Sequence, residues 1–177
     1  MIHYRVVAIP TEVAAQVRVS GKAPKYGFPT FIEVATGYGP CRHCLRTFDV
    51  GIESRVLFTY DPFDGIEDVP LPGPVFIHAA DCPRYPETAG YPCDMKSHAA
   101  IFSGFARGQR LVTQARVEKG NHEDVVHQIL QNSDVDYIEV RDRIAGCYDF
   151  RIERISGERH PAVYSRTLQR GDRKPSV

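Results

Sequence analysis

Short apolar runs, each closed by proline, glycine or a charged turn, follow one another along most of this chain. They are too short for helices and are rich in β-branched and aromatic residues, which favours β-strands. The expected strands lie at residues 2–9, 31–34, 53–60, 75–78, 99–106, 110–117, 137–140 and 147–155. Because these turn residues keep every apolar run short, the sequence predicts a strand-rich fold.

Helical patterns are expected at only two places. Thr11 is the expected N-cap of a helix that runs to residue 17, and residues 123–131 have apolar side chains at helical spacing. His122 and His127 are expected on the solvent-exposed face of this second helix. Because the helices do not alternate regularly with the strands, we predict an α+β fold with a curved, mainly antiparallel sheet and two short helices.

Two stretches support antiparallel pairing. Residues 107–109 form a short, glycine-containing connection that suits a hairpin between the expected strands on either side. In the last expected strand, apolar residues beginning at Tyr148 alternate with charged residues beginning at Asp149. This alternation predicts one buried side and one solvent-facing side.

The length of 177 residues fits one globular domain, which we expect at residues 1–155. From residue 156 onward, five Arg or Lys residues stand against two acids and aliphatic residues are few, so we expect a polar, basic and mobile tail at 156–177. Over the whole chain, 22 basic residues balance 22 acidic ones. A neutral chain gives no electrostatic reason to expect a nucleic acid or an anionic membrane as a partner.

The expected location is the cytoplasm. No apolar run approaches the roughly 20 residues of a membrane-spanning helix, and the first ten residues lack the pattern of a signal peptide. The chain has five cysteines, an odd number. In a reducing compartment, a Cys-x-x-Cys motif binds metal or performs redox chemistry more often than it forms a structural disulfide.

The densest group of chemically active residues is Gly-Pro-Cys-Arg-His-Cys-Leu-Arg at residues 39–46. Cys41 and Cys44 have the spacing at which one tight turn presents both sulfurs to a single centre. His78 and Cys82 follow the end of another expected strand and would complete a Cys₃His set, which is a usual composition for a closed zinc site. We expect these residues to converge, with Cys147 nearby.

The spacing leaves other chemistry open. Arg42 and His43 lie between the two thiols and could stabilise a thiolate, as in a redox dithiol. Alternatively, Cys41 or Cys44 acts as a nucleophile with His78 as the base. Arginines suited to binding a carboxylate or phosphate of the substrate are Arg42, Arg46 and Arg84. The remaining alternative is that the cysteines only pack in the core.

Four motifs in order give the chain a family resemblance. They are Cys-Arg-His-Cys-Leu-Arg, then Tyr-Asp-Pro-Phe, then Gly-Pro-Val-Phe-Ile-His with a cysteine four residues later, then Gly-Cys-Tyr-Asp-Phe-Arg-Ile-Glu-Arg. The chain resembles the small bacterial proteins grouped as domain of unknown function 1203, from the first expected strand to about Arg154. This resemblance implies a soluble bacterial protein of about this size and carries no established activity.

Two functions are therefore expected from the sequence. The first is binding of a small molecule, or thiol-based chemistry, at the Cys/His cluster. The alternative is a structural zinc site or disulfide at the same residues, in a non-enzymatic binding or interaction module.

Overall fold

The computed structural model describes residues 3–66 and 69–155, and the expected tail at 156–177 lies outside these residues. The elements in chain order are β1 (Tyr4–Val7), α1 (Thr11–Ser20), β2 (Phe31–Val34), β3 (Ser54–Tyr60), β4 (Gly73–His78), the 3₁₀ helix η1 (Cys93–Ser97), β5 (Ala100–Ala106), β6 (Arg110–Val117), α2 (His122–Leu130), β7 (Tyr137–Asp142) and β8 (Tyr148–Arg154). The fold is α+β, as the sequence predicts.

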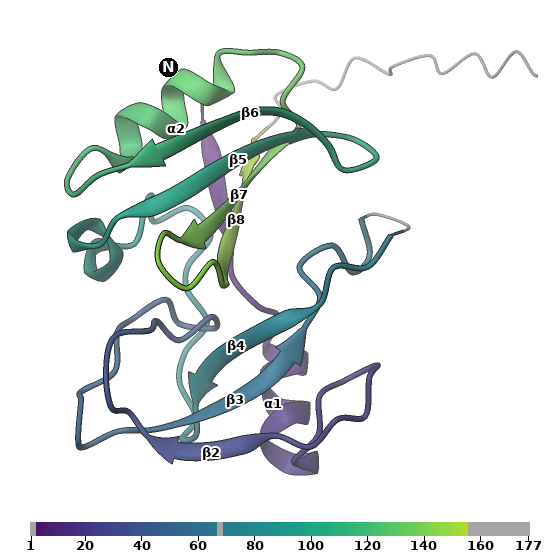
Figure 1. Ribbon diagram of the computed structural model, residues 1–177, viewed down its shortest axis with the longest axis vertical. Helices are drawn as coiled ribbons and strands as arrows, with labels where there is room; N and C mark the ends of the chain where they lie inside the picture. The colour runs from purple at the N-terminus through teal and green to yellow at the C-terminus, as the bar shows by residue number, and fades with distance from the viewer. Residues whose placement is uncertain (1–2, 67–68, 156–177) are drawn as a thin grey trace, which may run out of the picture.

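The described strands form two sheets, whereas the sequence predicts one. Five strands pair in the order β1-β8-β7-β5-β6, and three pair in the order β2-β3-β4, with every pairing antiparallel. Figure 1 shows the five-stranded sheet with α2 in the upper part of the molecule and the three-stranded sheet with α1 in the lower part. The chain passes from the upper part to the lower part after β1 and returns after β4, so residues far apart in sequence meet where the parts adjoin.

The upper part contains one hydrophobic core. Val126, Ile129 and Leu130 of α2 are buried against the sheet, together with Phe102 and Phe150. These helix positions are three and four residues apart, the spacing that places side chains on one face. The predicted β5–β6 hairpin is confirmed.

The lower part contains a second core, in which Ala14 and Val17 of α1 lie in one cluster with Val56 and Ile77 of the three-stranded sheet. The helix starts differently from the prediction, because Pro10 occupies the N-cap position and no side chain caps the helix there. The Thr11 hydroxyl is therefore free for a different contact, with His43.

The exposed position expected for His122 is wrong. Its side chain lies beneath the aromatic residues Tyr91 and Phe102, with 1% of the residue exposed. The ring Nε2 lies 2.8 Å from the carbonyl oxygen of His98. His122 is the first residue of α2, where the helix meets the loop that carries η1, and this loop covers the ring.

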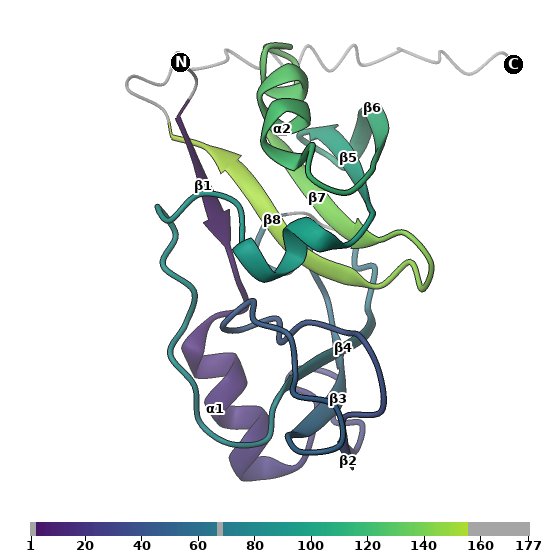
Figure 2. The same cartoon turned by 90° about the vertical axis from the view of Figure 1, so that its left-hand side faces the viewer.

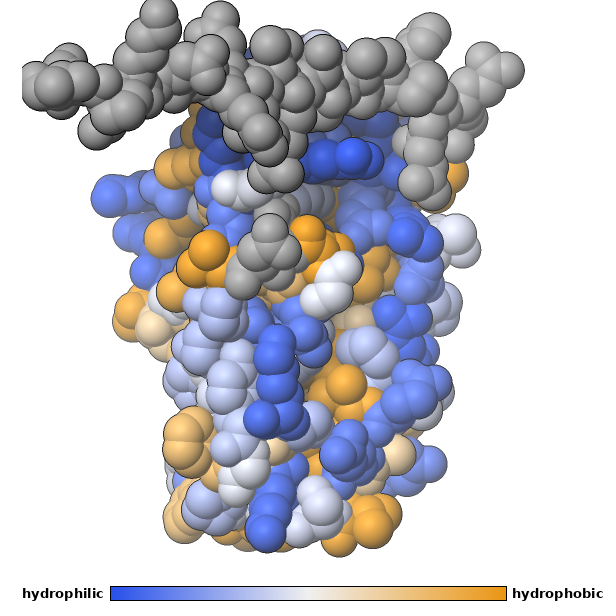
Figure 3. Space-filling view, turned by 90° about the vertical axis from the view of Figure 1, so that its right-hand side faces the viewer, coloured by the Kyte–Doolittle hydropathy of each residue, from blue (hydrophilic) through white to orange (hydrophobic). Residues whose placement is uncertain are grey.

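The surface mixes hydrophobic and hydrophilic side chains, which are interspersed on the face shown in Figure 3. Strand β2 lies at an edge of its sheet, and Phe31 and Ile32 there are 59% and 64% exposed. Among the helices at residues 3–66 and 69–155, none combines the length and apolar character needed to cross a membrane.

Candidate metal centre

Four residues from three separate segments bring their ligand atoms together. The sulfurs of Cys41, Cys44 and Cys82 and a ring nitrogen of His78 all lie within 4.8 Å of one another. His78 is the last residue of β4, and Cys82 lies in the irregular segment that follows. The convergence expected from the sequence is therefore present in the fold.

A tight turn presents Cys41 and Cys44 on the same side. The Cys41 amide donates to the carbonyl oxygen of Arg46 over 2.9 Å, and the Leu45 amide donates to the carbonyl oxygen of Cys41 over 2.8 Å. Leu45 adopts a left-handed conformation, with φ of 56°, which closes the turn. Both cysteines of the turn are buried.

His78 contacts the cluster through its backbone and its ring. Its amide donates to Cys41 Sγ over 3.3 Å, and its Nδ1 lies 3.4 Å from Cys44 Sγ. On the other side of the ring, Nε2 lies 3.3 Å from Oε2 of Glu53, and the ring of Phe48 packs at a centroid distance of 4.5 Å. The imidazole is thus fixed between the sulfurs and a carboxylate.

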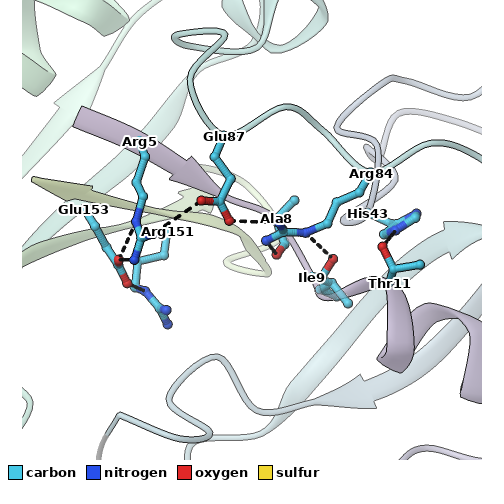
Figure 4. Close-up of polar contacts among 9 residues, drawn as sticks. All are labelled: Arg5, Ala8, Ile9, Thr11, His43, Arg84, Glu87, Arg151 and Glu153. Atoms are coloured by element: carbon cyan, nitrogen blue, oxygen red, sulfur yellow. Dashed lines mark hydrogen bonds and ion pairs between the residues drawn. The ribbon is translucent and has the colours of Figure 1, made fainter. Parts of the chain in front are cut away.

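Cys82 has two nitrogen neighbours of its own. Arg18 of α1 donates from Nη2 to Cys82 Sγ over 3.4 Å, and Nδ1 of His43 lies 3.3 Å from the same sulfur. Nε2 of His43 lies 3.1 Å from the hydroxyl of Thr11, as Figure 4 shows. Of the two residues between the cysteines of the turn, His43 is therefore the one that faces a thiol.

The segment after Cys82 is held firmly against the N-terminal elements. Figure 2 shows it passing along the outside of the molecule, beside α1 and β1. Arg84 donates to the carbonyl oxygens of Ala8 and Ile9, and its guanidinium pairs with Glu87. Glu87 also pairs with Arg5 of β1, and Figure 4 shows this network. These contacts fix the chain two residues beyond the Cys82 thiol.

The thiol cluster shifts the pKa values of its own members. Burial alone would raise the pKa of Cys41, but hydrogen bonds from Cys44, Cys82 and His78 outweigh burial and lower it. The hydrogen bond to Cys41 raises the pKa of Cys44, since Cys44 keeps its proton as the donor. Burial opposes protonation of His78, yet its hydrogen bonds with Cys41 and Cys82 raise its pKa to about 10. These directions favour a thiolate at Cys41, and a thiolate in this place also suits a cation.

The three arginines expected to bind a substrate lie in different surroundings. Arg42 is buried, with Nη2 2.9 Å from Oδ1 of Asp149 and Nε donating to the carbonyl oxygen of Tyr148 over 2.8 Å. Arg84 is occupied by the contacts described above, and Arg46 is exposed. Arg42 and Arg84 therefore use their donors within the chain.

Cys147 is not one of the four clustered residues. Its sulfur lies 3.8 Å from the carbonyl oxygen of Ala145, in the turn between β7 and β8. Cys93 is exposed in η1. The described cysteines thus divide into three at the cluster and two outside it.

Sequence reasoning missed two residues that support the cluster, Arg18 and Glu53. Arg18 is 64 residues from Cys82 along the chain, and Glu53 is 25 residues from His78. Neither belongs to a motif with its partner. Only the position of Glu53 at the start of a predicted strand hints at a role, because Glu53 directly precedes β3, which pairs with the strand of His78.

Comparison with known proteins gives a family and no function. The family described as "Protein of unknown function (DUF1203)" matches residues 38–154, which include all four cluster residues. The match begins later than the first strand, where the sequence resemblance was expected to start. No curated protein and no solved structure matches the chain. Because the family covers more than half of its length, the chain belongs to the DUF1203 family.

Proposed function

We propose that this protein is a zinc-binding domain in which Cys41, Cys44, His78 and Cys82 hold one zinc ion. The observation that carries the proposal is the approach of four soft ligand atoms to within 4.8 Å of one another. Zinc–sulfur bonds of about 2.3 Å in a tetrahedron separate two sulfurs by about 3.8 Å. The 4.0 Å between the sulfurs of Cys41 and Cys82 fits that spacing closely.

The surroundings of the ligands support zinc as the occupant. A histidine that binds zinc usually donates its other ring N–H to a carboxylate, and Glu53 lies on that side of His78. Three thiolates would leave the centre with net negative charge, and the guanidinium of Arg18 beside Cys82 offsets it. The backbone N–H of His78 gives Cys41 a further donor.

A structural role fits the centre better than a catalytic one. Catalytic zinc sites have three protein ligands and an open position for water or substrate, whereas four protein ligands close the tetrahedron. The bound ion would tie the 41–44 turn and the loop at Cys82 to the end of β4. It would add to the core of the three-stranded sheet, where Cys41 and Cys44 are buried. A domain of this kind serves as a binding or interaction module, and reduced thiols suit the cytoplasm as its location.

Metal analysis tests this proposal. The full chain is purified without added zinc or chelator, and zinc per chain is measured for the wild type, Cys44→Ser and Cys93→Ser. We expect about one zinc per chain in the wild type and in Cys93→Ser, and a clear loss in Cys44→Ser. Removing the metal with a chelator is expected to lower the melting temperature, since zinc binding is coupled to folding. A wild-type protein without zinc, or with an unchanged melting temperature after chelation, would contradict the structural role.

Thiol chemistry is the second candidate, and one observation favours it. Cys82 is only partly buried and has both a guanidinium and an imidazole next to its sulfur, an environment that makes thiols reactive. A single thiol that reacts rapidly with iodoacetamide in zinc-free native protein would favour this function. A small-molecule ligand remains a prediction under either candidate.

A further inference from the structure

We propose that Cys82 and Cys41 form a redox-sensitive pair, which a hydroperoxide converts to a disulfide with release of the metal. The inference rests on the proposed zinc centre and specifies how that centre is regulated. Three observations carry it: the access of solvent to one ligand, the groups beside that ligand, and a second sulfur 4.0 Å from it.

Access differs among the four ligand residues. Cys41, Cys44 and His78 are 0%, 5% and 7% exposed, whereas Cys82 is only partly buried. Cys82 also lies in an irregular segment, outside the strands and helices. An oxidant in solution therefore meets the sulfur of Cys82 first.

The groups beside Cys82 favour attack by its sulfur. The guanidinium of Arg18 is held in place, since Nη1 pairs with Asp81 over 3.0 Å and Nε donates to the carbonyl oxygen of His78 over 3.0 Å. Its Nη2 then lies 3.4 Å from Cys82 Sγ, where it stabilises a thiolate.

Cys41 is placed to complete the reaction. Its sulfur is 4.0 Å from that of Cys82, while the Cys44 sulfur faces Nδ1 of His78. Forming a disulfide bond of roughly 2 Å needs the two sulfurs to approach each other by about 2 Å. Cys41 is thus the resolving thiol.

The chemistry balances with a hydroperoxide as the named oxidant. The thiolate of Cys82 attacks the outer peroxide oxygen, so an S–O bond forms, the O–O bond breaks, and the alcohol leaves after taking a proton. The thiolate of Cys41 then attacks the Cys82 sulfur, so an S–S bond forms and the S–O bond breaks, with water leaving after a second proton is taken up. The two sulfurs supply the two electrons that reduce the peroxide. Two of the four ligands are lost, and the zinc ion dissociates.

The experiment treats the zinc-loaded full chain with hydrogen peroxide. Zinc content is measured first, free zinc is followed with a metal-sensitive dye, and the disulfide is mapped by mass spectrometry without reduction. We expect zinc to be released in step with a Cys41–Cys82 linkage, and a thiol reductant with added zinc to restore the centre. Release without that linkage, or a linkage of Cys41 to Cys44, would overturn the inference.

Three variants sharpen the result. Arg18→Met should slow peroxide-dependent zinc release by about fivefold, the effect of losing one charge-assisted hydrogen bond, while Arg110→Met on the exposed end of β6 should release zinc at the wild-type rate. Cys93→Ser should also behave as the wild type. Equal rates for Arg18→Met and Arg110→Met would overturn the role given to Arg18. Absence of zinc before the peroxide is added would instead contradict the proposed function, whereas bound zinc that resists peroxide contradicts only this inference.

Discussion

Oε2 of Glu53 lies 3.3 Å from Nε2 of His78, on the side of the imidazole turned away from the sulfur of Cys44. Glu53 is itself fixed, because its Oε2 accepts the Asp49 amide over 2.8 Å. The carboxylate can therefore hold the ring in one tautomer and one orientation, with Nδ1 directed at the thiol cluster.

Replacing this carboxylate should weaken the metal centre without removing it. We expect Glu53→Gln to lower zinc affinity by about 10- to 100-fold, because partners of a ligand histidine contribute effects of this size. Competition with a chromophoric chelator measures the affinity. The matched control is Glu12→Gln, which changes an exposed acid in the first turn of α1. Equal affinities for the two variants would show that Glu53 does not support His78.

The buried pair of Arg42 and Asp149 joins the cysteine turn to β8, with 2.9 Å between Nη2 and Oδ1. Truncating one partner leaves the other charge buried without its counterion, which costs about 3–5 kcal/mol. We therefore expect Arg42→Ala and Asp149→Asn each to lower the free energy of unfolding by an amount in this range. Denaturant unfolding of both single variants and of the double variant measures the coupling. A double variant whose loss in free energy of unfolding equals the sum of the two single losses would contradict a direct pair.

Gly104 of β5 lies where any larger side chain would be crowded. An added Cβ would meet methyl groups of Thr113, Ile129 and Val135 at 3.0, 3.1 and 3.2 Å. We expect Gly104→Ala to lower the free energy of unfolding by about 1–3 kcal/mol through overpacking. Gly73→Ala is the control, because a Cβ there has no neighbour within 4 Å. Similar stabilities for the two variants would contradict the packing between β5 and α2.

The carboxylate of Glu153 makes stability depend on acid pH. Burial raises its pKa, but Arg151 and Arg5 outweigh burial, so the folded pKa lies below the ordinary value of 4.5. Its contribution is therefore present above about pH 4.5 and is lost as the pH falls through the folded pKa. We expect Glu153→Gln to be about 1 kcal/mol less stable at pH 7 and to approach the wild type on acidification. A difference in stability between the wild type and Glu153→Gln that stays constant down to pH 3 would contradict this assignment.

Much of the local structure could be predicted from the sequence, because turn residues and short apolar runs act over a few positions. The strand at 31–34 has its predicted bounds, and the hairpin strands differ by at most one residue. The division into two sheets could not be predicted in this way, since it depends on which strands pair over long distances. Asp149 illustrates the consequence: its side of β8 was expected to face solvent, but the cysteine turn covers it and its exposure is 2%.

In the candidate site too, local patterns could be predicted and long-range contacts could not. Cys41, Cys44, His78 and Cys82 were predicted to meet because their types and strand-end positions suit one centre. Their supporting partners were not predicted, because a guanidinium or carboxylate reveals its partner only once the elements have packed. Arg42 was expected to face a substrate because a guanidinium group suits binding of a carboxylate or phosphate. Its burial against Asp149 depends on the tertiary fold, which the sequence pattern does not give.

X-ray absorption at the zinc edge, on protein purified with its natural metal, reports the ligands of the proposed centre. We expect one zinc per chain with three sulfur neighbours at about 2.3 Å and one nitrogen neighbour at about 2.0 Å. A centre with only nitrogen and oxygen neighbours, or protein with no zinc edge and five free thiols, would contradict it.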